Sequence, residues 1–224
     1  MKNVVVISAH PDDEVLGAGG TLLKHLSNGD KLFWIIVTNI SSKSGHSNFK
    51  IKSRKNEIKK VQESFNFSST FILDYIPSSL SSSMMSKLVS DISSIFYKIE
   101  PEIIYCVNRS DAHTDHKFTF DSVMSCTKSF RFPFIKKVLV YECISETEFA
   151  PAVFENYFLP NYFVDISNFI EKKINIFKIY ESEIGEHPFP RSIRNIKSLA
   201  SFRGASVGVD FAESFQLIKF IDKN

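Results

Sequence analysis

Short apolar runs alternate with helix-like stretches through the first half of the chain. Strand-like runs cover residues 4–8, 32–37, 71–75 and 103–107. Between them, apolar side chains recur every three or four residues over 16–26, 50–65 and 84–99, the spacing of amphipathic helices. This alternation predicts a mostly parallel sheet with right-handed crossovers and helices on both faces.

The second half continues with weaker signals. A helix over 116–129 precedes a strand over 137–143, and a strand over 161–166 precedes a helix over 167–182 whose lysine-rich face we expect to lie in solvent. Residues 215–221 form a final strand or helix. A length of 224 residues suits one sizeable domain, so we predict a single domain over 1–224, a Rossmann-like three-layer α/β/α sandwich.

Two polar clusters follow two of the predicted strands. The segment His10-Pro11-Asp12-Asp13-Glu14 comes after 4–8, and the segment 111–116 comes after 103–107. Open α/β sheets place their active sites at the carboxyl ends of strands. His10 and Asp13 are three residues apart and can face one ion, and imidazole nitrogen with carboxylate oxygen suits zinc. His113 and His116 have the same spacing, so one can bind the metal while the other faces a substrate.

Helix capping is the competing explanation for the first cluster. An Asp after a strand often caps the next helix, Pro often begins it, and the helix dipole favours acids in its first turn. Capping accounts for one or two carboxylates and leaves His10 without a role. A dinucleotide-binding glycine motif does not fit, because His-Pro-Asp-Asp follows the strand and Leu22 stands where the third glycine would fall.

The first cluster, continued through residues 15–21, and His113-x-Asp115-His116 together resemble the PIG-L/LmbE-like family of zinc-dependent N-deacetylases. This family removes acetyl groups from N-acetylated amino sugars and their conjugates. The resemblance implies that zinc is held by His10, Asp13 and His116. It makes Asp12 the general base and a protonated His113 the group that faces the developing oxyanion. Asp115 would orient His113 or tune its charge.

The same resemblance implies three substrate-binding residues. Arg54 and Glu57 match an Arg-x-x-Glu spacing in which the Arg reaches the sugar. A Pro-Arg-Ser segment within 186–192 resembles a branch of the family and presents His187 and Arg191 to a polar ligand. The alternative for this segment is a stiff connector that leads into a helix near Arg191 or Ser192. After 71–75 the chain reads Ile-Pro-Ser where the family often has Asp-Gly, so part of the substrate contact differs.

The composition limits the kinds of partner that the chain is expected to bind. A formal net charge of +2 gives no affinity for nucleic acid, and no apolar run is long enough to span a bilayer. The three cysteines are unpaired in sequence and two lie in apolar runs, which predicts buried thiols in a cytoplasmic protein. The 22 phenylalanines belong mostly to the core but leave room for an apolar face in a homo-oligomer.

The expected function is hydrolysis of the acetamide of a small N-acetylated sugar or sugar conjugate by metal-activated water, in glycan or polysaccharide precursor metabolism. Two alternatives stay open: a zinc hydrolase of another N-acyl substrate, such as a thiol-precursor glycoconjugate, and a non-enzymatic α/β ligand-binding module. A binding module has no need of Asp12. The sequence also leaves open whether Arg54, Arg191 or Arg109 meets a phosphate or nucleotide.

Overall fold

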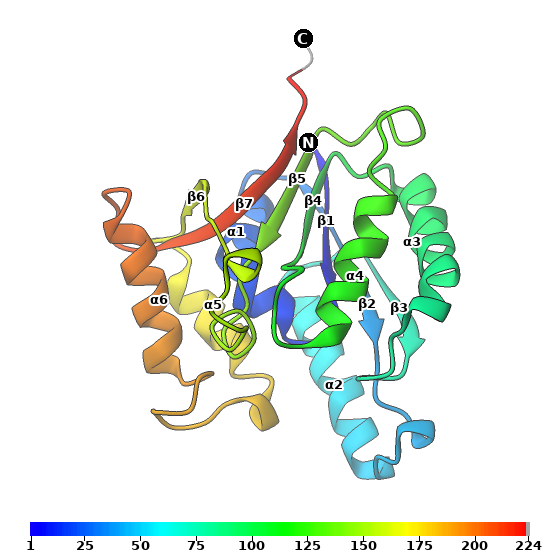
Figure 1. Cartoon of the computed structure of the whole chain (residues 1–224). Helices are drawn as coiled ribbons and strands as arrows, with labels where there is room; N and C mark the ends of the chain where they lie inside the picture. The colour runs from blue at the N-terminus through cyan, green and yellow to red at the C-terminus, as the bar shows by residue number, and fades with distance from the viewer. Residues whose placement is uncertain (223–224) are drawn as a thin grey trace.

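The computed structural model describes residues 1–222 and contains one seven-stranded sheet in the order β3-β2-β1-β4-β5-β7-β6 (Figure 1). The strands are β1 Asn3–Ser8, β2 Lys31–Thr38, β3 Ser69–Tyr75, β4 Ile103–Val107, β5 Lys137–Tyr141, β6 Tyr162–Asp165 and β7 Ala212–Phe220. The α-helices are α1 Asp13–Ser27, α2 Asn48–Ser64, α3 Met85–Ile99, α4 Thr114–Ser125, α5 Ile170–Phe177 and α6 Ile193–Ala205. Short 3₁₀ turns are η1 Ser42–Ser44, η2 Ser82–Met84, η3 Phe154–Asn156 and η4 Glu181–Glu183.

The first five strands are parallel, as the alternation of strand and helix predicts. β1 lies directly beside β4, with Val4 opposite Ile103 and Ile7 opposite Cys106. The chain leaves β1 for β2 on one side and reaches β4 on the other, so the boundary between them is the point where the strand order reverses. The two polar clusters of the sequence therefore emerge at the same edge of the sheet.

Buried side chains alternate between the two faces of the sheet. Val4 and Val6 of β1 pack with side chains of α1, α2, α5 and α6, whereas Val5 and Ile7 pack with side chains of α3 and α4 (Figure 1). Both faces are thus covered by helices, which confirms the predicted three-layer sandwich. Among residues 1–222, no helix combines the length and the apolar character that a membrane crossing requires.

The structure decides one open alternative of the second half and corrects one prediction. The final element, left open as a strand or a helix, is the strand β7, which lies between β5 and β6 and runs antiparallel to both. The helix predicted over 167–182 is shorter, because α5 ends at Phe177 and η4 follows it. The lysine-rich face is not wholly in solvent: Lys173 is 4% exposed, since its Nζ donates to the Leu16 carbonyl at 2.8 Å and to Glu213 Oε1 at 2.7 Å.

The glycines of α1 permit close packing. A Cβ on Gly17 would lie 2.1 Å from Cδ2 of Tyr141, and one on Gly20 would lie 2.7 Å from Cγ2 of Ile166. Each glycine costs a helix interior about 1 kcal/mol relative to alanine. This cost is offset because α1 can approach Tyr141 of β5 and Ile166, which lies between β6 and α5.

Candidate functional site

The first two candidate ligands lie in the turn between β1 and α1. The backbone N–H of His10 donates to Asp13 Oδ2 at 2.9 Å, and His10 Nδ1 is 3.8 Å from the same oxygen. Burial by itself would raise the pKa of Asp13, but the neighbouring His116 and His10 outweigh it and hold that pKa below its usual range. Asp13 is therefore a carboxylate, as a metal ligand must be.

His116 completes this group from the first turn of α4. Its ring is fully buried, and its Nδ1 lies 2.7 Å from Asp111 Oδ2. Its Nε2 is buried, has no hydrogen-bond partner and lies 3.4 Å from Asp13 Oδ2. A carboxylate that holds one ring nitrogen and leaves the other free is how metal-binding histidines are usually oriented. The unpartnered nitrogen beside two further donors fits a metal ion.

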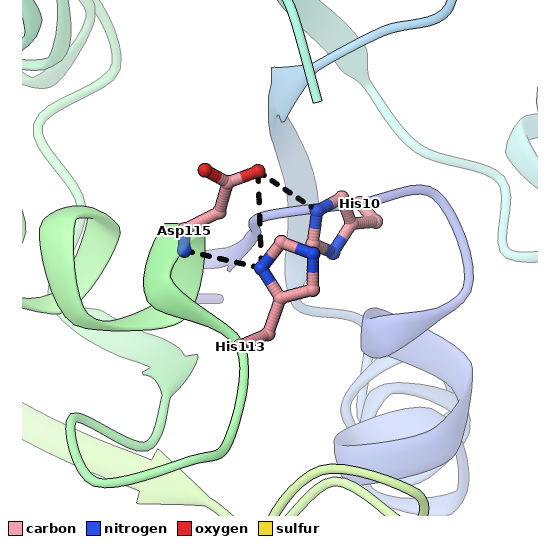
Figure 2. Close-up of side chains that lie close together, drawn as sticks. All are labelled: His10, His113 and Asp115. Atoms are coloured by element: carbon pink, nitrogen blue, oxygen red, sulfur yellow. Dashed lines mark hydrogen bonds and ion pairs between the residues drawn. The ribbon is translucent and has the colours of Figure 1, made fainter. Parts of the chain in front are cut away.

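Two overlapping sets of side chains have metal-binding spacing, because in each set the three ligand atoms lie within 4.8 Å of one another. One is His10, Asp13 and His116; the other is His10, His113 and Asp115, shown in Figure 2. In the second set, His113 Nδ1 already accepts the backbone N–H of Asp115 at 3.1 Å (Figure 2). His113 Nδ1 is thus used within the protein, whereas His116 Nε2 is free.

The Asp115 carboxylate is occupied as well. It accepts the backbone N–H of Ser78 at 2.7 Å and of Leu80 at 3.2 Å, and it lies 3.1 Å from His10 Nε2 (Figure 2). The sequence predicts that Asp115 orients His113; in the structure its backbone N–H contacts His113 Nδ1, while its carboxylate contacts His10. Burial first, and then His10, lowers the pKa of His113, so the ring is neutral rather than protonated as expected, and the hydrogen lies on Nε2.

Asp12 faces the pocket instead of capping α1. Its backbone has φ 139° and ψ −30°, an unusual conformation for a residue other than glycine, and its side chain makes no cap hydrogen bond. Glu14 fixes this turn: Oε2 accepts the Asp12 N–H at 3.1 Å and Oε1 accepts the Tyr180 hydroxyl at 2.7 Å. Burial, with Asp13 adding to it, raises the pKa of Asp12 well above its usual range. Capping therefore does not explain this residue.

A cavity of about 220 Å³ opens in front of these groups. Of the predicted substrate-binding residues, Arg54 and Arg191 line it, whereas His187 is exposed and is not among the lining residues. Arg109 is also outside the lining and pairs with Asp121 at 2.9 Å. Ser192 caps α6 by accepting the Asn195 N–H at 3.2 Å, so the connector alternative for 186–192 holds together with the placement of Arg191 in the pocket.

Ser145 and Glu146 lie in the loop 145–149, which the sequence places on the rim of the site, whereas the lining residues Cys143 and Glu183 were not predicted to belong to it. Cys143 Sγ lies 3.5 Å from Asp13 Oδ1, and burial, followed by Asp13, raises the pKa of this thiol. The predicted burial of Cys106 and Cys143 is confirmed, and Cys126 is buried as well. Glu183 binds both arginines of the pocket. No local pattern marks Cys143 and Glu183 for the site, because they reach it only through the packing of the second half of the sheet.

The doubly wound sheet, with a histidine–aspartate group at the strand-order reversal, defines a Rossmann-like α/β protein with a site suited to a metal ion. Within that class, the chain belongs to the PIG-L family. The family profile, described as GlcNAc-PI de-N-acetylase, matches residues 5–127, more than half of the 224 residues. Both polar clusters fall inside the matched part.

Individual relatives are distant in sequence. Diacetylchitobiose deacetylase from Thermococcus kodakarensis is 23% identical over 227 residues, covering 97% of this chain and 84% of the relative. The structure of N,N'-diacetylchitobiose deacetylase from Pyrococcus horikoshii superposes with a TM-score of 0.75 at 20% identity, covering 97% and 84% of the two chains. The 4-carboxy-2-hydroxymuconate hydratase GalB from Pseudomonas putida gives 0.73 at 18% identity, covering 100% and 99%. The fold alone thus accommodates more than one reaction.

Proposed function

We propose that the chain is a zinc-dependent N-deacetylase that hydrolyses the acetamide of an N-acetylated amino sugar or sugar conjugate. The observation that carries this proposal is the buried, unpartnered Nε2 of His116, which faces Asp13 and His10 beside the uncapped carboxylate of Asp12. Membership of the PIG-L family and a diacetylchitobiose deacetylase among the relatives support the same reaction.

In this proposal the metal ligands are His10 Nδ1, Asp13 Oδ2 and His116 Nε2. Two imidazole nitrogens and one carboxylate oxygen form a donor set typical of catalytic zinc, which leaves a coordination position for water. Zinc held there would polarise an amide carbonyl and lower the pKa of a bound water. Asp111 and Asp115 hold the outer nitrogens of His116 and His10, which fixes both rings.

Asp12 is the proposed general base. A carboxylate with a raised pKa accepts a proton more readily at neutral pH than an ordinary aspartate, and the cause here is its burial together with Asp13. The strained turn aims its side chain into the cavity rather than at the helix. After the proton has moved to Asp12, the same carboxyl group can deliver it to the departing sugar amine.

His113 is the proposed partner of the oxyanion. Its Nδ1 accepts a backbone N–H, so its Nε2 carries the hydrogen and lies at the pocket, 3.4 Å from Ser78 Oγ. A neutral imidazole N–H donates to a developing negative charge on the carbonyl oxygen of the substrate. Loss of one such donor typically costs about 2.7 to 4 kcal/mol of transition-state stabilisation.

The test is amine release from a panel of N-acetylated sugars by zinc-loaded wild type, D12N and D210N. Asp210 is exposed and outside the pocket, so D210N is the matched control. We expect wild type and D210N to release amine, and D12N to retain zinc while losing roughly 100-fold or more in kcat.

Three outcomes would contradict the proposal or its parts. If D12N is as active as wild type, Asp12 is not the general base. If wild type and D12N both bind zinc and the N-acetylated sugars but hydrolyse no acetamide, the result would favour the non-enzymatic binding module. Failure of wild type to bind zinc would exclude the metal centre itself.

A further inference from the structure

Two arginines of the pocket share one carboxylate. Arg191 Nη2 lies 3.1 Å from Glu183 Oε2, and Arg54 Nη2 binds Glu183 Oε1. Arg54 comes from α2 and Glu183 from η4, whereas Arg191 lies in the loop before α6. The three side chains are between 13% and 21% exposed and all line the cavity beside Asp12. We call this group the Glu183 clamp.

The remaining guanidinium nitrogens of the clamp are also occupied. Arg54 Nη1 donates to the Pro11 carbonyl at 3.1 Å, and its Nε is 3.3 Å from Glu57 Oε2. Arg191 Nε donates to the Glu183 carbonyl at 3.0 Å and Nη1 donates to Ser145 Oγ at 2.8 Å. Every nitrogen of the two guanidinium groups therefore already has an acceptor within the protein.

The two positive charges of the clamp are balanced once Glu57 is counted with Glu183. The two guanidinium groups are matched by the carboxylates of Glu183 and Glu57, and the same cavity also contains Asp12 and Glu146. A phosphate that bound either arginine would have to displace Glu183 and leave a half-buried carboxylate without its partners, which is costly. Each Nη carries two hydrogens, so a sugar hydroxyl, which is uncharged, can accept a second N–H of Arg191 Nη1 or Arg54 Nη1 without displacing Glu183.

We propose that Glu183 makes the pocket selective for uncharged substrates. The pocket then binds an N-acetylated sugar that carries no phosphate or nucleotide group. This inference rests on the proposed deacetylase function and narrows its substrate class. Glu183 acts by holding Arg54 and Arg191, so it is a positioning residue. The presence of two arginines in the pocket does not indicate a phosphate site here, because both are already paired with carboxylates of the protein.

The test compares kcat/KM for N,N'-diacetylchitobiose with kcat/KM for N-acetylglucosamine 6-phosphate and UDP-N-acetylglucosamine, using zinc-loaded enzyme. Wild type should favour the uncharged substrate by about tenfold or more. E183Q keeps the size of the side chain but releases a net positive charge, so the ratio should shift toward the phosphorylated substrates by about tenfold, and less at high ionic strength. E181Q, at an exposed position of the same 3₁₀ turn, should leave the ratio unchanged.

An equal change of kcat/KM for all three substrates in E183Q, or a wild-type preference for the phosphorylated ones, would overturn the inference. If E183Q does not fold, product inhibition of wild type gives the answer: glucosamine 6-phosphate should bind no tighter than glucosamine, and tenfold tighter binding would contradict the proposal. Absence of amine release from every substrate would instead count against the deacetylase function.

Discussion

His116 depends on one carboxylate for its orientation. Asp111 Oδ2 holds Nδ1 at 2.7 Å, and the other oxygen of Asp111 accepts the Asn108 amide at 2.8 Å and the Thr147 hydroxyl at 2.7 Å. These contacts fix the aspartate itself, so the imidazole can turn only one nitrogen toward Asp13. The charge of Asp111 also makes His116 a stronger donor to a cation.

D111N should therefore weaken zinc binding by about 10- to 100-fold, because the asparagine keeps the shape but loses the negative charge. Competition with a chromogenic chelator measures the affinity. D210N, at an exposed position, should bind zinc as wild type does. An unchanged affinity in D111N would show that Asp111 does not support a metal ligand.

The contrast between His116 and Glu183 shows what the sequence could predict at the site. His10, Asp13 and His116 stand in compact motifs directly after apolar runs, so their meeting follows from neighbouring parallel strands. Glu183 contacts Arg54 across 129 residues, and nothing in its own neighbourhood predicts that contact. The ring nitrogen of His113 that carries the hydrogen is likewise set by a hydrogen bond that the structure alone reveals.

At the scale of elements, α1 is joined to the second half of the chain by a buried ion pair. Lys173 of α5 binds Glu213 of β7, and Glu213 also accepts the backbone N–H groups of Gly20 at 2.8 Å and Thr21 at 2.7 Å. This network fixes the helix that carries Asp13. The sequence predicted α1 from its periodicity, but it placed the lysines of α5 in solvent because a buried lysine has the same local pattern as an exposed one.

K173M should lower the free energy of unfolding by about 3–5 kcal/mol, because it leaves the Glu213 carboxylate buried without its cation. Urea unfolding measures the change. The double variant K173M/E213Q should recover part of the loss, and K172M, at an exposed position of the same helix, should change stability by less than about 0.5 kcal/mol. A K173M loss as small as that of K172M would mean that the pair contributes nothing.

At the scale of the whole molecule, the proposed metal joins two units of the sheet. His10 and Asp13 belong to the β1–α1 unit, and His116 belongs to the β4–α4 unit on the opposite side of the strand-order reversal. α1 and α4 also pack on different faces of the sheet. A ligand that binds only the folded chain at this junction stabilises the whole fold.

Zinc at 1,000 times its Kd should stabilise the folded chain by about 4.1 kcal/mol, a rise in Tm of roughly 8–16 °C for a chain of this size. Differential scanning fluorimetry with zinc, and then with excess chelator, measures the shift. H116A should remove the shift and D210N should keep it. A shift that persists in H116A would place the ion elsewhere.

The proposed catalytic residues and most of the Glu183 clamp lie in different parts of the chain. The side chains proposed to hold the ion and move the proton all precede residue 127, within the part that matches the family, and so does Arg54 of the clamp, whereas Ser145, Glu183 and Arg191 follow it. The stretch 142–191 also contains Tyr180, which bonds to Glu14 in the Asp12 turn, and Lys173, which bonds to the Leu16 carbonyl of α1. An engineer who exchanges this rim for that of a relative must therefore keep both residues if the proposed catalytic base is to stay in place.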